Sequence, residues 1–373
     1  MRIGHYAPTL WAPGGIATWV SRLGQAQAAR GSDVFYLTSS RMPDEPHPTG
    51  HVPTVDSLFK SARDLGLDVL HLHKEVPSIP DPTVRVLRTM HGNQASCPTG
   101  SRFLEKRGRP CDRVAGVLAC SWGHVVDRCG SVRPDAVRGH INRFQAERRV
   151  LPSLLVHTVS EFLRRRMIEA GYNGSRIVTV LSPAPVKAAE PSPPPRNGIP
   201  RFVFLGRVVP AKGARWLLRA MVRSKETFEV DIAGDGYELA DLKRFASENG
   251  LADRVAFHGW LGGDAVDALV RDSRAVVFPS IWHEPAGLVT LEAAAAGRAV
   301  VAGRVGGIPE YADERFAVLV DPGNVEELAG ALDALARDYD RAARLGASGR
   351  TFVREHFAMP DFVDRIDQLY NAA

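Results

Sequence analysis

The chain has 373 residues, of which 45% are hydrophobic and 24% charged, and its formal net charge is +5 at pH 7. This length suits two domains of ordinary size, and the balance of apolar and charged residues excludes a disordered or collagen-like chain. No run reaches the ~18 apolar residues that span a bilayer, and the first ten residues lack the apolar segment of a secretory signal. We therefore expect a cytoplasmic protein.

The first half of the chain alternates short β-branched runs with helical patterns, which is typical of βαβ units and a parallel sheet. Strands are predicted over residues 3–6, 34–38, 69–73, 84–90, 155–159 and 177–181. Helices are predicted over 16–30 and 161–170, because Gly31 and Gly171 follow them as C-terminal caps. Ser160 stands where the second helix needs its N-cap.

A glycine pair follows the first predicted strand. Gly14 and Gly15 open the helix over 16–30, and the absence of Cβ atoms lets backbone N–H groups approach a phosphate at a helix N-terminus. A glycine-rich connection of this kind is also found as a plain tight turn. The pair is therefore a candidate phosphate contact only in combination with other motifs.

The stretch from residue 102 to 166 is basic. It carries 14 Lys and Arg against 6 Asp and Glu, so it could face an anionic membrane, nucleic acid or a phosphorylated substrate, or it could be a solvated surface. The four cysteines fall in or beside it, at Cys97, Cys111, Cys120 and Cys129. Their spacing contains no C-x2-C pair, which favours reduced thiols or an occasional disulfide over a structural metal or cluster.

Seven prolines between residues 183 and 200 predict a stiff linker. The pattern of strands and helices then restarts, with strands over 202–205, 228–233, 254–258, 275–278, 299–302 and 317–320 and helices over 238–249, 328–339 and 360–370. We therefore predict two Rossmann-like, doubly wound parallel-sheet domains, at 1–182 and 201–359, with a ligand cleft between them.

Two cations follow the first strand of the second half. Arg207 and Lys212 stand five residues apart on a loop between Gly206 and Gly213. Such a pair can hold the two phosphates of a diphosphate and stabilise the charge that develops on a departing phosphate. Two solvated surface cations would be the simpler interpretation if this loop stood alone.

The segment after the strand over 275–278 carries two carboxylates eight residues apart. Pro285 is placed as the first helical residue after Glu284, and the N–H groups of residues 287 to 289 would then form an anion site. Glu292 would lie roughly 12 Å further along the helix. This separation suits an elongated ligand with a hydroxyl-bearing group at each end, because carboxylates accept hydrogen bonds from hydroxyls.

The second half resembles the nucleotide-binding domain of glycosyltransferase family 4, also called glycosyl transferases group 1. The resemblance rests on Glu284 to Glu292 as the Glu-x7-Glu element, on Gly206, Arg207, Lys212 and Gly213, and on the sequence Gly-Gly-Ile-Pro-Glu at 306–310. It runs in register from about residue 202 to 332, while the first half is similar more loosely. The resemblance implies a retaining enzyme of the GT-B fold, whose last helix, here 360–373, packs back on the first domain.

The resemblance also implies roles for residues of the second half. Arg207 and Lys212 would neutralise the diphosphate of a nucleotide-diphosphate sugar. Glu284 would contact the transferred sugar, and Glu292 would contact the ribose. These enzymes are thought to react by front-face attack and need no metal or other cofactor.

Four further residues complete the implied donor site. Leu288 and Val289, behind Gly287, would offer backbone N–H groups to phosphate. Gly15 would let the first domain approach the same group, and His91 would hydrogen-bond the donor sugar. A lone histidine at a strand end is otherwise more often structural.

We therefore expect a retaining, metal-independent transferase that moves a hexose, of the N-acetylglucosamine, glucose or mannose type, to an acceptor hydroxyl. The acceptor would be a glycan, a lipid-linked molecule or a natural product, and peripheral contact with the inner face of an anionic membrane is a further hypothesis. The alternatives are a nucleotide-sugar epimerase or phosphorylase on the same fold, and a basic, metal-containing nucleic-acid-binding protein. Under the main hypothesis no nucleic acid is bound.

Overall fold

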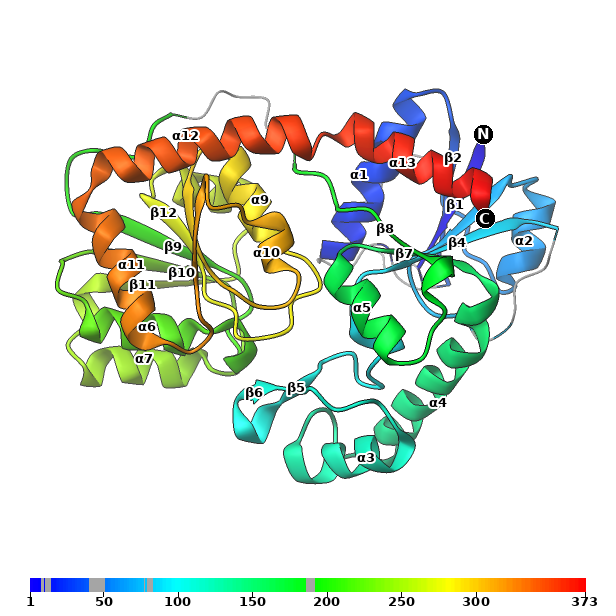
Figure 1. Ribbon diagram of the computed structural model, residues 1–373, viewed down its shortest axis with the longest axis horizontal. Coiled ribbons are helices and arrows are strands. Elements are labelled where there is room, and N and C mark those ends of the chain that lie inside the picture. Colours follow the sequence, from blue (N-terminus) through cyan, green and yellow to red (C-terminus); the bar gives the residue numbers. More distant parts are fainter. Residues whose placement is uncertain (8–9, 11–14, 40–50, 77, 79–82, 186–191) are drawn as a thin grey trace. The chain divides into compact units, whose positions relative to one another are not determined.

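The computed structural model describes residues 1–7, 10, 15–39, 51–76, 78, 83–185 and 192–373, which form two compact units (Figure 1). Unit 1 comprises Met1–Ser101, Arg113–Leu181 and Met359–Ala373, and unit 2 comprises Arg102–Asp112 and Ser182–Ala358. Each unit contains a six-stranded parallel sheet. The α/β class predicted from the alternating segments is therefore confirmed.

The sheet of unit 1 has the strand order β2-β1-β3-β4-β7-β8, and its neighbouring strands are parallel. The strands are β1 (Arg2–Tyr6), β2 (Asp33–Leu37), β3 (Val69–Leu72), β4 (Arg85–Met90), β7 (Leu155–Thr158) and β8 (Ile177–Thr179). β3 is buried along its whole length, as expected in a parallel sheet covered on both faces. The order reverses between β1 and β3, and ligands of such sheets bind at the carboxyl ends of the strands at this switch point.

The helices of unit 1 are α1 (Gly15–Ala29), α2 (Leu58–Asp64), α3 (Val117–Trp122), α4 (Pro134–Val150), α5 (Glu161–Glu169) and α13 (Met359–Ala372). α1 and α5 end close to the predicted positions, because Gly31 and Gly171 adopt left-handed φ angles of +86° and +93° that glycine tolerates without strain. The Oγ of Ser160 accepts a hydrogen bond from the backbone N–H of Leu163 at 3.2 Å. Ser160 is therefore the N-cap of α5, as predicted.

The C-terminal helix α13 contributes to the core of unit 1. Phe362, Ile366 and Tyr370 recur every fourth position, so they share one face of the helix. All three are buried and pack in one cluster with Ile3 of β1 and Leu23 of α1. This side-chain packing joins the fourteen-residue helix α13 to the first strand of the sequence.

The sheet of unit 2 has the strand order β11-β10-β9-β12-β13-β14, again with parallel neighbours. The strands are β9 (Arg201–Leu205), β10 (Glu229–Ala233), β11 (Val255–Gly259), β12 (Ala275–Phe278), β13 (Ala299–Gly303) and β14 (Ala317–Val320). This is the strand order of a dinucleotide-binding Rossmann sheet, and its switch point lies between β9 and β12.

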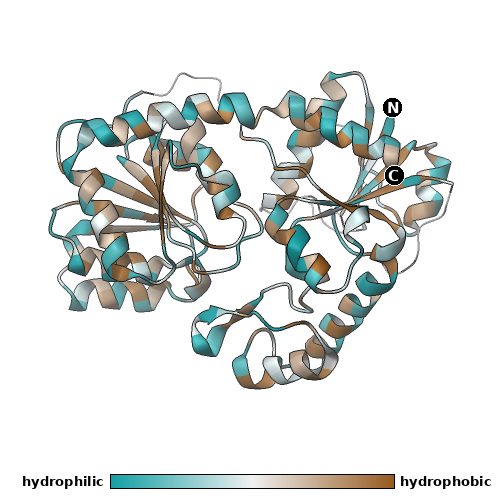
Figure 2. Cartoon of the chain, viewed as in Figure 1, coloured by the Kyte–Doolittle hydropathy of each residue, from teal (hydrophilic) through white to brown (hydrophobic). Residues whose placement is uncertain are grey.

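The helices of unit 2 are α6 (Ala214–Arg223), α7 (Leu239–Glu248), α8 (Gly263–Arg271), α9 (Leu288–Ala295), α10 (Ile308–Tyr311), α11 (Val325–Arg337) and α12 (Tyr339–His356). A short antiparallel pair, β5 (Phe103–Leu104) and β6 (Arg109–Pro110), also belongs to this unit. Apolar residues dominate the strands, while the helices alternate apolar and polar faces (Figure 2).

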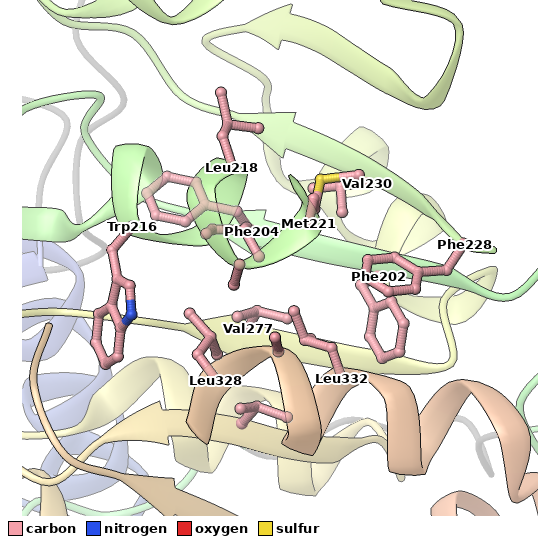
Figure 3. Packing of buried hydrophobic residues seen from close by; sticks show 14 of the residues in the cluster. Phe202, Phe204, Trp216, Leu218, Met221, Phe228, Val230, Val277, Leu328 and Leu332 are labelled. Atoms are coloured by element: carbon pink, nitrogen blue, oxygen red, sulfur yellow. The ribbon is translucent and has the colours of Figure 1, made fainter. Parts of the chain in front are cut away.

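Aliphatic and aromatic side chains fill the core of unit 2 (Figure 3). The rings of Phe202 in β9 and Phe228 pack edge to face, with centroids 5.0 Å apart. Leu328 and Leu332 of α11 lie in the same fully buried cluster. Because interiors are packed as densely as organic crystals, this core holds the carboxyl ends of β9 and β12 in fixed positions.

The structure adds elements that the sequence analysis did not assign. α4, α3 and a π-helical turn over Gly123–Asp127 lie in the basic stretch, and residues 102–112, predicted within the first domain, group with unit 2. In the predicted linker, the described residues 183–185 and 192–200 contain no helix or strand, and residues 186–191 lie outside the described part of the chain. Within that part, no helix is both long enough and apolar enough to cross a bilayer.

Candidate active site

Two loops meet at the switch point of the unit 2 sheet. β9 and β12 are paired neighbours, and the loops that follow them, residues 206–213 and 279–287, leave from the same edge of the sheet. A main-chain hydrogen bond of 3.1 Å from Ile281 N to Ala211 O joins the two loops. The carboxyl ends of β9 and β12 therefore place both predicted motifs side by side.

An ion pair between Lys212 and Glu284 connects these loops. Lys212 Nζ lies 2.6 Å from Glu284 Oε1, and Ser280 Oγ donates to the same oxygen at 2.7 Å. Only 15% of the Lys212 side chain and 6% of the Glu284 side chain are exposed. The ammonium also lies 5.4 Å from the ring centre of Phe278 and 5.1 Å from that of Trp282, a further electrostatic contact. The pair is thus held in place from several sides.

Gly213 lets the Lys212 loop pass close to the next strand. Its φ is +76°, and a Cβ at this position would collide with the carbonyl oxygen of Pro279. Both the left-handed backbone and the close approach require glycine. The glycine that ends the Gly-Arg…Lys-Gly motif is therefore needed to bring Lys212 next to the loop that carries Glu284.

The variant Gly213→Ala is expected to lower the free energy of unfolding of unit 2 by about 2–5 kcal/mol, the combined cost of a positive φ and of forced backbone movement. Gly250→Ala is the matched control. Its φ is +67°, and among the described residues nothing lies within 4 Å of the added Cβ, so only about 1–2 kcal/mol should be lost. Urea unfolding followed by circular dichroism measures both values, and equal losses would show that the approach to Pro279 is not restrictive.

The loop after β13 packs against the main chain of Glu284. Gly307 N donates to Glu284 O at 2.7 Å, and Gly306 has a φ of +63°. A Cβ on Gly306 would collide with the backbone nitrogen and oxygen of Glu284. The Gly-Gly pair at 306–307 therefore fixes the position of the carboxylate-bearing loop.

The helix after Glu284 begins later than predicted. The sequence analysis placed its first residue at Pro285, which is wrong, because α9 begins at Leu288 with Gly287 as its N-cap. The bonds between Glu284 and the glycine loop, together with that from Glu284 N to Trp282 O at 2.7 Å, hold the chain out of helical geometry. The sequence analysis derived the separation of Glu284 and Glu292 from one continuous helix, and the later start of α9 removes that premise.

The N–H groups of Leu288 and Val289 belong to the first turn of α9, where helix geometry provides no acceptor. Both residues are half-buried and follow the loop that carries Glu284. Their position directly after the loop that carries Glu284 is compatible with the predicted contact to an anion.

Arg207 and Glu292 lie outside the ion pair. Arg207 is exposed on the loop after β9; its positive charge partly offsets the rise in the pKa of Tyr237 that burial and the bond to Glu105 cause. Glu292 is half-buried on α9. Of the four predicted charged residues of unit 2, the structure thus brings Lys212 and Glu284 into direct contact.

The chain is similar to known glycosyltransferases. The family described as Glycosyl transferases group 1 matches residues 187–352. The GDP-mannose-dependent alpha-(1-6)-phosphatidylinositol monomannoside mannosyltransferase of Mycobacterium tuberculosis is 34% identical over 322 residues, which are 80% of this chain and 82% of that protein. The chain belongs to the glycosyl transferases group 1 family.

A second relative agrees with this assignment, and a solved structure shows the fold. An uncharacterized glycosyltransferase of Bacillus subtilis is 29% identical over 242 residues, which are 62% of this chain and 66% of that protein. The solved structure of sucrose-phosphate synthase from Thermosynechococcus elongatus, 20% identical, has a TM-score of 0.72 and covers 100% of this chain and 98% of its own. The fold is GT-B, as the resemblance implied.

In this group 1 glycosyltransferase, His91 directly follows β4 of unit 1. It is half-buried, and its Nε2 lies 3.0 Å from His73 Nδ1. Trp19 of α1 packs edge to face against the His91 ring, with ring centres 4.8 Å apart. Burial, assisted by the charge of Arg88, lowers the pKa of His91 well below its ordinary value, so the imidazole is neutral at pH 7. Gly15 is the first residue of α1, and Gly14 lies outside the described residues.

The cysteines do not gather into a ligand set. All four lie within the described residues and are partly buried, and no disulfide joins them. In the described part of the chain, the one group of three or more possible ligands whose atoms lie within 4.8 Å of one another is His5, His71 and His73. The alternative of a cysteine metal site therefore gains no geometric support.

Sequence reasoning missed several residues around the unit 2 loops. Tyr237 in the loop after β10 donates to Glu105 Oε2 at 2.7 Å, and His283 lies 3.6 Å from Asp112. These pairs are far apart in the sequence, so no local pattern predicts them. Ser280, which holds Glu284, stood within the recognised motif but carries no distinguishing signal of its own.

Proposed function

We propose that the protein is a retaining glycosyltransferase that transfers a hexose from a nucleotide-diphosphate sugar to an acceptor hydroxyl without a metal. The observation that carries the proposal is the buried Lys212–Glu284 pair at the β9–β12 switch point. Family membership supports the reaction class, and the Mycobacterium tuberculosis relative is named as GDP-mannose-dependent.

Lys212 supplies positive charge for the leaving diphosphate. Its ammonium is largely withdrawn from water, and a preorganised charge in such a site stabilises developing negative charge better than the same group in water. Arg207 and the first N–H groups of α9 would bind the outer phosphate oxygens. Glu292 would accept a hydrogen bond from the ribose.

Glu284 is arranged to bind a hydroxyl. Lys212 and Ser280 both bond to Oε1, so within the described residues Oε2 remains available to accept from a sugar hydroxyl. In the proposed reaction the bond from the anomeric carbon to the diphosphate oxygen breaks, and the acceptor oxygen bonds to that carbon on the same face. The acceptor proton passes to the leaving phosphate, so no protein nucleophile is required.

The test begins with a panel of UDP-, GDP- and dTDP-hexoses in a thermal-shift assay, because a bound donor stabilises the folded state by mass action. The donor found is then incubated with candidate acceptors, and NMR identifies the anomeric configuration of the product. We expect one nucleotide class to raise Tm, and a product with the donor's configuration. An inverted product would contradict the retaining mechanism.

The same experiment separates the alternatives. An epimerase would interconvert donor sugars without releasing a nucleotide diphosphate, which NMR of the donor pool detects. A nucleic-acid-binding protein would bind nucleic acid in a salt-dependent way that Glu284→Ala leaves intact.

We also propose that residues 114–138, which include α3 and are called the α3 segment below, contact an anionic membrane, which would suit a lipid-linked acceptor. Five large apolar residues there are 56% to 88% exposed: Val114, Leu118, Trp122, Val125 and Val132. The hydrophobic colouring of α3 is seen in Figure 2. Arg128, Arg133 and Arg138 are exposed beside them, and basic residues add about 1 kcal/mol each at an anionic surface.

Co-sedimentation with phosphatidylglycerol-containing vesicles tests this contact. The double variant Leu118→Ser/Trp122→Ser is expected to lose binding, and added salt should weaken the wild type. Trp260→Ser is the control, since Trp260 is 68% exposed but belongs to unit 2. Equal binding to neutral vesicles, or equal loss in the control, would count against a specific α3 contact.

A further inference from the structure

A continuous chain of hydrogen bonds runs through the interior of unit 1. Its eight bonds measure 2.6 to 3.1 Å and join side chains from four strands and two helices to a backbone carbonyl. In order, its members are Val180 O, His157, Thr89, His71, Tyr370, Gln27, His5, His73 and His91. Their direction can be derived from the chemistry of each group.

The backbone end of the chain sets the direction. Val180 O can only accept, so the Nε2 of His157 carries a proton and donates to it at 2.9 Å. A neutral imidazole has one N–H, so the Nδ1 of His157 accepts from the hydroxyl of Thr89 at 2.8 Å. Having donated its only proton, Thr89 Oγ1 must accept from His71 Nε2 at 2.6 Å.

The same reasoning fixes the donor and acceptor of the bonds made by Tyr370 of α13 and Gln27 of α1. The Nδ1 of His71 accepts from the hydroxyl of Tyr370 at 2.8 Å. Tyr370 has then used its proton, so its oxygen accepts from the amide N–H of Gln27 at 3.1 Å. The amide oxygen of Gln27 is thereby turned toward His5 and accepts from His5 Nε2 at 2.8 Å.

The last two bonds of the chain have the same donor-to-acceptor direction and end at His91. The Nδ1 of His5 accepts from His73 Nε2 at 3.0 Å, and the Nδ1 of His73 accepts from His91 Nε2 at 3.0 Å. His91 therefore carries its proton on Nε2. Its Nδ1 makes no hydrogen bond within the described part of the chain and presents a lone pair.

The opposite direction is costly. If Gln27 were turned around, each bond would reverse until Thr89 accepted from His157 Nδ1. His157 would then need protons on both nitrogens, since Val180 O still requires a donor. Burial lowers the pKa of His157 to about 4, and an ionised imidazole without a counter-ion in the interior is strongly disfavoured.

We propose that this chain, with Tyr370, Gln27, His5 and His73 as positioning residues, fixes His91 as the Nε2–H tautomer, so that His91 accepts a hydrogen bond from a sugar hydroxyl through Nδ1. The inference rests on the proposed function, together with the hydrogen bond to the donor sugar that the family resemblance implies for His91. A tautomer fixed by a distant partner matters, since the wrong histidine tautomer costs other enzymes orders of magnitude in rate.

The cluster of His5, His71 and His73 could alternatively hold a metal ion. Both ring nitrogens of each histidine already take part in the chain, so an ion would have to break these bonds. The hydrogen-bonded arrangement is therefore the one the geometry favours. Binding of a metal ion at these histidines is one of the results that the experiment below can reveal.

NMR of protein labelled with 15N-histidine tests the direction itself. Protonated and bare ring nitrogens have well-separated resonances, and single His variants assign them. At pH 7 we expect the five histidines of the chain to be neutral, each with its proton on Nε2. A proton on Nδ1 of His91 would overturn the proposal, as would one equivalent of zinc that binds and removes the signals of His5, His71 and His73.

Tyr370→Phe interrupts the chain four bonds from His91. Without the hydroxyl, Gln27 can turn either way, so His91 should show both tautomers, and kcat/KM for transfer should fall by about two- to tenfold as the competent form becomes a fraction of the whole. Tyr36→Phe is the matched control. Tyr36 is fully buried beside His5, with ring centres 6.0 Å apart, yet its hydroxyl has no hydrogen-bond partner among the described residues. It should change neither the tautomer nor the rate; an unaltered His91 spectrum in Tyr370→Phe would refute the directional role.

Variants of His73 connect the tautomer to the reaction. His73→Leu removes the acceptor for His91 and should lower kcat/KM by about 10–100-fold, the usual loss for a positioning partner. His73→Asn places an amide oxygen where Nδ1 stood and should recover most of that loss. If the tautomer is as derived but His73→Leu transfers sugar normally, the assignment of His91 to the donor site fails while the chain stands. If no donor binds the wild type, the proposed function itself fails.

Discussion

Lys212→Ala is expected to lower kcat/KM for sugar transfer by about 10²-fold or more. The variant removes the ammonium that pairs with Glu284 at the switch point, and removal of a single preorganised group that stabilises transition-state charge costs about this much. The loss should appear in kcat as well as in donor affinity, because the charge on the diphosphate grows as the bond to the sugar breaks. Steady-state kinetics with the donor found in the thermal-shift panel gives both values.

A structural effect of the same substitution must be separated from a chemical one. Removal of Lys212 leaves the buried carboxylate of Glu284 with Ser280 as its partner, and breaking a buried pair commonly costs about 3–5 kcal/mol. The double variant Lys212→Met/Glu284→Gln removes both charges and should regain stability without regaining activity. Recovery of transfer in the double variant would mean that the lysine only holds the loop.

Lys243→Ala is the matched control for loss of a lysine. Lys243 lies exposed on α7 of the same unit, where its ammonium is 5.9 Å from the ring centre of Phe257. Neither the rate nor the unfolding free energy should change by more than the small amounts typical of surface substitutions. A comparable loss in this variant would indicate a general charge effect on donor association.

Local sequence patterns were sufficient to predict the strands of both sheets. β12 and β14 begin and end at the predicted residues 275–278 and 317–320. A short apolar run between turn signals is typical of a buried strand. The same holds for helix ends at which a glycine adopts a positive φ, such as Gly31 and Gly250. In these places the physical cause lies within a few neighbouring residues.

The position of Glu284 could not be predicted in the same way. Pro285 favours the first turn of a helix, and that local preference pointed to a helix beginning there. The contacts that override it come from Gly306 and Gly307, about twenty residues further along the chain. The order of residues in the sequence thus identified the motif. Its conformation, however, depends on the loop at 306–307, which lies next to Glu284 only in the folded sheet.

The histidine chain shows the same limit more strongly. The first strand, the third strand and the last helix each contribute residues that look like ordinary core or surface positions. Tyr370 and His71, for example, are 299 positions apart yet share a bond of 2.8 Å. No periodicity distinguishes a histidine that completes such a chain from one that packs alone, so only His91 was singled out, and that through resemblance.

Unit 1 is expected to lose stability steeply as the pH falls from about 6.5 to 4. Burial lowers the pKa of His5 and of His157 to about 4, and it lowers those of His71 and His73 well below the ordinary value. The unfolded chain takes up protons on these groups near pH 6.5, whereas the folded unit does not. The stabilisation is therefore complete above pH 6.5 and is lost as the pH falls toward the folded-state pKa.

The magnitude follows from the number of protons involved. Each histidine that is neutral in the folded state and protonated in the unfolded state contributes about 1.4 kcal/mol per pH unit. His5 and His157 together give up to about 2.7 kcal/mol per pH unit, before His71 and His73 add to the slope. A fall of two pH units then removes an amount comparable with the total stability of a typical domain, about 5–15 kcal/mol.

Urea unfolding between pH 7.5 and 4.5 measures this slope. His157→Gln keeps a donor for Val180 O but removes one titrating group, so it should reduce the slope by about 1.4 kcal/mol per pH unit. His356→Gln is the control, because His356 lies exposed on α12 in unit 2, outside the histidine chain. A slope that is the same in all three proteins would mean that water or protons reach the histidine chain in the folded state, and the fixed tautomer of His91 would then lose its physical basis.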